Sequence, residues 1–177
     1  MGLKSQDVYV ALKIVAGGLR RAPYSELASE LIMSSSEVHA CVQRAQASQL
    51  LHGQALQNRP NVAALEEFLL HGLRYVFPAE RGEITGGVPT SYAAEPLLSL
   101  IAPGTEPIPV WPCEAGGKRG TAFAPLYKTA PMAALRDARF YEYLVLADAL
   151  RDGRVRERRI AESELRRRLR RVRAAQR

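Results

Sequence analysis

Side chains able to hydrogen-bond nucleic acid gather between residues 34 and 59 of the 177-residue chain. Glutamine can bond adenine through two hydrogen bonds, arginine can bond guanine or phosphate, and small serines let a helix approach a groove closely. Backbone amides at a helix N-terminus also bind phosphate. The candidate DNA-binding residues are Ser34, Ser35, Ser36, His39, Gln43, Arg44, Gln46 and Arg59.

The residue types that carry other chemistries are present without the necessary spacing. Cys41 and Cys113 are far apart, and the three histidines show no metal-ligand pattern, so we expect no metal ion and no cofactor. The glycine-rich basic run at residues 116–121 lacks P-loop spacing and follows no apolar strand. No nucleophile elbow or acidic pair appears either, and we therefore expect that the protein is not an enzyme.

The candidate DNA-binding residues must be positioned by the helices that the N-terminal pattern predicts. A first helix is expected over residues 3–16 and a second after Pro23. Ser34 and Glu37 form a Ser-x-x-Glu capping box that starts a third helix over residues 35–49. If Val38 and Val42 of this helix face the core, the candidate residues lie on the opposite face.

The run from Tyr24 to His39 resembles the turn of bacterial winged helix-turn-helix regulators of the MarR-like type. The similarity rests on a Tyr-x-Glu-Leu-Ala start, a leucine before the turn, a serine cap and a valine four residues later, while Ile32 replaces the usual glycine. It covers about residues 5–60 and implies that helix 35–49 lies in the major groove. It also implies a short wing at residues 53–61, with Arg59 at its tip. Helical modules that dock on proteins share this pattern and remain an alternative.

The middle of the chain is expected to contain little regular structure. After a predicted helix over residues 62–76, residues 78–131 hold nine of the 11 prolines and seven of the 13 glycines. The prolines in residues 86–92 and 107–112 argue against central strands, because proline donates no ladder hydrogen bond. This segment could wrap the helical domain, form a ligand pocket or bind a partner.

The net charge of +7 belongs wholly to the end of the chain, since residues 136–177 hold fourteen arginines against seven acids. Helices are expected over residues 138–150 and from about residue 155, the latter with a stripe of Ala161, Leu165, Leu169 and Val172. The arginines could bind phosphates, remain solvated while the stripe packs on the body or a twin helix, or dock an acidic protein. Residues 147–158 are also similar to segments of regulators encoded beside nucleotidyltransferase-type toxins.

These patterns predict a mainly helical protein in three parts. Residues 1–77 form a winged helix-turn-helix DNA-binding domain with the following helix, residues 78–135 a Pro/Gly-rich loop segment, and residues 136–177 an arginine-rich helical segment. We expect a cytoplasmic, sequence-specific transcriptional regulator that binds double-stranded DNA as a homodimer and has no membrane span. The alternative is an antitoxin-like protein that binds and neutralises a partner protein.

Overall fold

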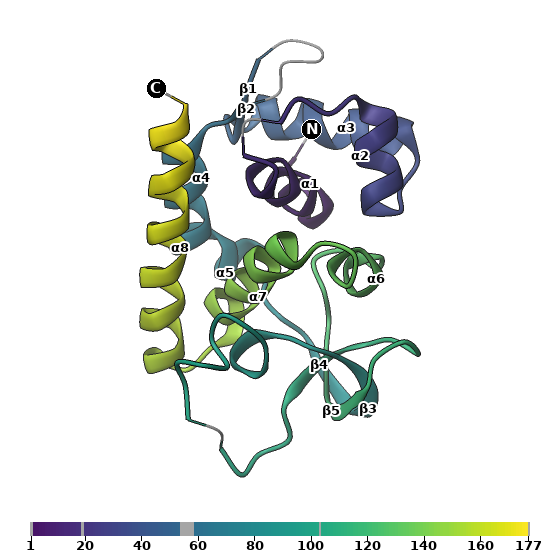
Figure 1. The fold of residues 1–177 in the computed structure, drawn as a ribbon, viewed down its shortest axis with the longest axis vertical. Coiled ribbons are helices and arrows are strands. Elements are labelled where there is room, and N and C mark those ends of the chain that lie inside the picture. Colours follow the sequence, from purple (N-terminus) through teal and green to yellow (C-terminus); the bar gives the residue numbers. More distant parts are fainter. Residues whose placement is uncertain (1, 19, 54–58, 103, 177) are drawn as a thin grey trace.

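The computed structural model describes residues 2–18, 20–53, 59–102 and 104–176. It is mainly helical, with a small three-stranded sheet at the end of the molecule opposite α2 and α3 (Figure 1). The elements are α1 (Ser5–Ala16), α2 (Tyr24–Leu31), α3 (Ser35–Ala47), β1 (Leu51–His52), β2 (Arg59–Pro60), α4 (Val62–Glu67), the π-helical turn η1 (Phe68–Gly72), α5 (Leu73–Val76), β3 (Arg81–Pro89), the 3-10 turn η2 (Ser91–Ala93), β4 (Pro109–Pro112), β5 (Lys118–Phe123), α6 (Ala130–Ala134), α7 (Ala138–Asp152) and α8 (Val155–Ala175).

Helix α1 forms the centre of the core, and every residue from Asp7 to Ala16 is buried. Figure 1 shows α1 nearly end-on, with α3 above it and α7 below it. Helix α8 runs along one edge and packs on α4 and α7. The prediction of a mainly helical chain is confirmed, and all three predicted N-terminal helices are present.

Helices α2 and α3 are joined by residues 32–34. Ile32 has a φ of 55° and a ψ of 50°, the left-handed conformation in which glycine is most easily accommodated. A glycine is the usual residue at this point of the sequence pattern, and here a β-branched residue adopts the same backbone shape. The next two residues lead directly into α3, so the turn stays short.

The prediction of little regular structure in the middle segment is wrong. Strands β3, β4 and β5 each pair with the other two, antiparallel in β3–β4 and β3–β5 and parallel in β4–β5. The prolines do not prevent this, because Pro89, Pro109 and Pro112 are the terminal residues of their strands. A Cβ atom at Gly87 would collide with the carbonyl of Trp111, so the close approach of β3 and β4 requires glycine there.

The middle segment is also packed into the core. Val88, Trp111 and Phe123, one from each strand, are buried with the helical residues in a single hydrophobic cluster. The short helix α6, which the proline and glycine content did not predict, packs against α7 and α2. Residues 78–135 therefore share one core with the helices that precede and follow them.

Candidate nucleic-acid interface

Helix α3 is held against α1 and α2, and its own N-terminal residues define where it begins. The Ser34 hydroxyl accepts a hydrogen bond from the Glu37 amide at 3.2 Å, and the Glu37 carboxylate accepts one from the Ser34 amide at 3.0 Å. The predicted capping box is thus confirmed. Because the capping box uses the Ser34 side chain, the role of Ser34 is to start the helix. Its hydroxyl also lies 3.1 Å from that of Ser36, and Ser35 and Ser36 are both exposed.

One face of α3 is exposed and carries small or neutral polar side chains. Ser35, Ser36, His39 and Gln43 all lie at the surface. The side chains of His39 and Gln43 are neighbours, with 3.4 Å between their nitrogens, and the His39 ring packs edge-on against Tyr24 at 5.2 Å between centroids. These contacts pre-order the two polar groups before any ligand is bound.

Arg44 does not belong to this face, and its predicted exposure is wrong. Its side chain is only 8% exposed and forms an ion pair with Asp7 of α1, whose side chain is fully buried. The guanidinium bonds both Asp7 oxygens, with Nη2 at 2.6 Å from Oδ1 and Nε at 2.9 Å from Oδ2. A guanidinium held in this way joins α3 to α1 and is not available to a DNA base.

Gln46 and Arg59 lie at the other end of α3, where the two-stranded hairpin of β1 and β2 begins. The Gln46 side chain donates a hydrogen bond to the Gly53 carbonyl at 2.9 Å, which ties α3 to the hairpin. Arg59 is exposed on β2 and pairs with His52 on β1. Most of the predicted wing, residues 54–58, lies outside the described residues. The described strands do place a basic residue beside the exposed end of α3.

The electrostatics of this surface are weak. Hydrogen bonds from the Ser34 backbone, the Ser34 hydroxyl and the Tyr127 hydroxyl, in that order, lower the pKa of the Glu37 carboxyl, so a negative charge stands at the start of α3. This negative charge interacts favourably with the helix dipole but repels phosphate. Lys128 lies near enough to Glu37 to act on its pKa, and among the described residues it is the one cation that does so. Base contacts rather than phosphate attraction would have to carry any specificity here.

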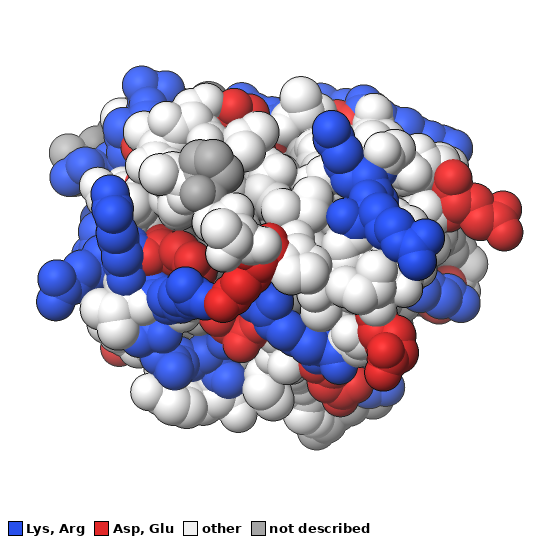
Figure 2. All heavy atoms as spheres, turned by 90° about the horizontal axis from the view of Figure 1, so that it is seen from below, with Lys and Arg blue, Asp and Glu red and all other residues white. Residues whose placement is uncertain are grey.

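The arginine-rich helix α8 packs on the body of the protein, and several of its arginines form ion pairs with neighbouring helices. Its stripe of Ala161, Leu165, Leu169 and Val172 is buried, as the sequence predicts. Arg166 pairs with Glu66 of α4 at 2.7 Å, and Arg168 pairs with Glu142 of α7 at 2.8 Å. The face of the molecule seen from below in Figure 2 likewise mixes basic and acidic side chains. The basic balance of the chain does not become one continuous basic surface on that face.

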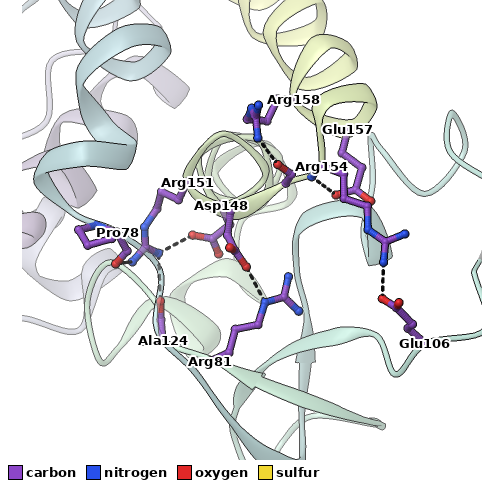
Figure 3. A network of polar contacts seen from close by, with 11 residues as sticks. Pro78, Arg81, Glu106, Ala124, Asp148, Arg151, Arg154, Glu157 and Arg158 are labelled. Carbon is purple, nitrogen blue, oxygen red and sulfur yellow. Dashed lines mark hydrogen bonds and ion pairs between the residues drawn. The ribbon is translucent and has the colours of Figure 1, made fainter.

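Sequence reasoning missed a buried polar cluster between α7 and the sheet (Figure 3). Asp148 is 1% exposed, and one of its oxygens accepts hydrogen bonds from the Thr90 hydroxyl and the Trp111 indole, each at 2.7 Å. Its other oxygen lies 2.8 Å from the guanidinium of Arg151. Arg151 also donates a hydrogen bond to the Ala124 carbonyl. Burial raises the pKa of Asp148, and the positive charge of Arg151 offsets part of that rise. The cluster fixes the strands to α7, and its only sequence signal was the occurrence of Asp148 and Arg151 within the apolar run at residues 143–151 of α7.

Within the described ranges, no group of three or more His, Cys, Asp or Glu side chains is arranged to hold a metal ion. Over the same residues, no helix combines the length and apolar character needed to cross a membrane. In comparisons with known proteins, no family model, no curated protein and no solved structure matches this chain. The geometry of α2, α3 and the hairpin is therefore the basis on which a function can be inferred.

Proposed function

We propose that the protein is a sequence-specific DNA-binding transcriptional regulator in which α3 enters the major groove. The observation that carries the proposal is the exposed α3 face of Ser35, Ser36, His39 and Gln43, delivered by a capped helix directly after a short turn. A helix-turn-helix presents its second helix to base edges in this way. The hairpin β1–β2 follows α3, in the order that a winged helix-turn-helix requires.

Each exposed residue has a defined task in this proposal. The Gln43 amide donates to N7 and accepts from N6 of an adenine, and this bidentate pairing gives it a preference for that base. His39, next to it, supplies a second hydrogen-bonding group. Ser35 and Ser36, in the first turn of α3, contact a backbone phosphate and set the register. Arg59 of β2 contacts a phosphate or the adjacent minor groove.

The test is binding to DNA from the region upstream of the protein's own gene. We expect salt-sensitive binding that survives excess unrelated competitor DNA. Gln43→Ala should weaken binding to the preferred site by about 1–3 kcal/mol and relax specificity at one base pair. The matched control is Ser163→Ala, a polar-to-alanine change at an exposed position of α8. No competitor-resistant binding to any upstream fragment would reject the proposal.

A homodimer that binds two half-sites is part of the same proposal, because a helix-turn-helix regulator typically doubles its contacts through two-fold symmetry. Light scattering of the protein alone and with DNA should give the mass of two chains per site. A stoichiometric protein that co-purifies from the native host, in place of DNA, would favour the antitoxin-like alternative.

A further inference from the structure

A hollow of about 610 Å³ opens between the first turns of α7 and the last turns of α8. Its volume falls within the range of about 300–1000 Å³ that is typical of small-ligand sites. Most of the lining residues are charged, namely Arg139, Arg167, Arg168, Arg171 and Glu142, and Ala138 and Tyr143 complete the lining. A hollow with this lining suits a hydrophilic anion and is unsuited to an apolar effector.

The ion pairs around the hollow leave an excess of positive charge. Arg168 pairs with both Glu142 and Glu164, and Arg167 pairs with Glu164 at 2.7 Å. Arg139 and Arg171 form no ion pair with any described carboxylate. Four guanidinium groups and two carboxylates give the hollow a local charge of about +2. Two of the four, those of Arg167 and Arg168, are already held in place by their ion pairs.

A buried hydroxyl at the same hollow has no acceptor for its proton in the described part of the chain. Tyr143 is 1% exposed, and among the described residues no group lies in normal hydrogen-bond geometry to its hydroxyl. Burial raises the pKa of Tyr143, while the charges of Arg139 and Arg168 and a weak hydrogen bond from the Arg139 side chain act in the opposite direction, which places both cations near this hydroxyl. A buried donor is usually satisfied, and its neighbours here are the groups that would bind an anion.

We propose that this hollow binds a small phosphorylated ligand that carries at least two phosphate groups. Arg139 and Arg171 bind its oxygens directly, Arg167 and Arg168 neutralise its charge, and the Tyr143 hydroxyl donates the hydrogen bond that it otherwise lacks. Every lining residue of the hollow belongs to α7 or α8, and none belongs to α3 or to the described strands of the hairpin. This placement favours a free ligand over the backbone of a duplex held by α3.

The inference does not depend on DNA binding and is tested with inorganic pyrophosphate. Isothermal titration at about 150 mM salt should show saturable binding to the full chain that is stronger than binding of sulfate, because salt at that strength screens diffuse surface attraction. Arg139→Ala and Arg171→Ala should each weaken pyrophosphate binding about tenfold, as expected for the loss of one charge-assisted hydrogen bond. Arg170→Ala is the matched control, since Arg170 is exposed on α8 outside the hollow.

Tyr143→Phe separates a ligand-binding role from a structural one. Removing an unpaired buried hydroxyl should leave the thermal midpoint of the free protein unchanged or higher, while pyrophosphate binding weakens severalfold. The proposal is overturned by three results: no pyrophosphate binding, equal weakening by Arg170→Ala, or equal affinity for sulfate, which would indicate an adventitious ion only. Loss of duplex binding in Arg139→Ala without any pyrophosphate binding would assign the hollow to the DNA backbone and also overturn it.

Discussion

Arg44→Ala should destabilise the protein without removing a DNA contact. Asp7 is fully buried, and the guanidinium of Arg44 is its only charged partner within ion-pair distance among the described residues. In the variant the Asp7 carboxylate keeps one hydrogen bond, from the Lys4 amide at 2.8 Å, and loses its counter-charge. A buried carboxylate without a counter-charge is strongly unfavourable.

The expected size of this effect follows from what remains around Asp7. Breaking a buried ion pair by removing one partner typically costs about 3–5 kcal/mol, and the retained Lys4 hydrogen bond favours the lower end, about 3 kcal/mol. In a chain of this size, that loss lowers the thermal midpoint by about 6–12 °C. It is a large part of the total stability of about 5–15 kcal/mol that is usual for a domain.

The assay is urea denaturation followed by circular dichroism, with Arg170→Ala as a surface-arginine control that should change the free energy of unfolding by less than about 0.5 kcal/mol. Replacing both partners, as Asp7→Leu with Arg44→Met, should recover much of the lost stability, because the unpaired charge is gone. If Arg44→Ala left stability unchanged and selectively weakened binding to preferred DNA, the reasoning would be refuted and Arg44 would be a base contact after all.

Three further predictions address other parts of the fold. The pKa of Glu164 is lowered, mainly by hydrogen bonds from Arg167. The ionised Glu164 therefore stabilises the fold above its unfolded pKa of about 4.3, and this stabilisation is lost as the pH falls through the lowered pKa of the folded state. In urea titrations, Glu164→Gln should lower the free energy of unfolding at pH 7 and lower it by less at pH 3. Burial raises the pKa of the Cys41 thiol to about 11, so at pH 8 iodoacetamide should modify the more exposed Cys113 first, as peptide mass spectrometry would reveal; faster labelling of Cys41 would contradict this. Leu169→Ala should cost about 2–5 kcal/mol by calorimetry, because Leu169 is completely buried; a neutral result would mean that α8 is not docked.

The helices were predictable because their signals are local. The capping box of Ser34 and Glu37 sets the start of α3, and the apolar stripe of α8 is buried as its spacing predicts. The predicted third helix extended to residue 49, whereas α3 ends at Ala47. A difference of two residues is typical of helix ends, where the last carbonyl groups have no partner within the helix.

The strands of the middle segment were not predictable from proline content. Each of β3, β4 and β5 is paired through contacts distant in sequence, and Pro89, Pro109 and Pro112 are the terminal residues of their strands. Sequence patterns report how many prolines a segment holds, but the position of each relative to a ladder depends on tertiary pairing. The same limit hid the cluster of Asp148 and Arg151, which is satisfied by groups from four other segments.

Of the candidate DNA-binding residues, the structure changes the role of Arg44 most. Helical spacing placed it opposite Val38 and Val42, but it lies at the edge of the buried face and meets Asp7 across the α1–α3 contact. The available signal was Asp7 itself, a lone acid at the start of the apolar run in α1. Truncation after Gly153 would remove α8 and expose the surfaces of α4 and α7 that its apolar stripe covers, so arginine substitutions are the better test of phosphate binding.

The central claim is that the exposed face of α3 reads DNA sequence, and comparing Gln43→Ala with Ser163→Ala on two DNAs tests it most directly. Fluorescence anisotropy would be measured on the preferred upstream fragment and on a random duplex of the same length, at one salt concentration. We predict that Gln43→Ala loses about 1–3 kcal/mol on the preferred fragment only, and that Ser163→Ala changes neither affinity. Equal losses on both duplexes, or no loss on the preferred fragment, would contradict the claim.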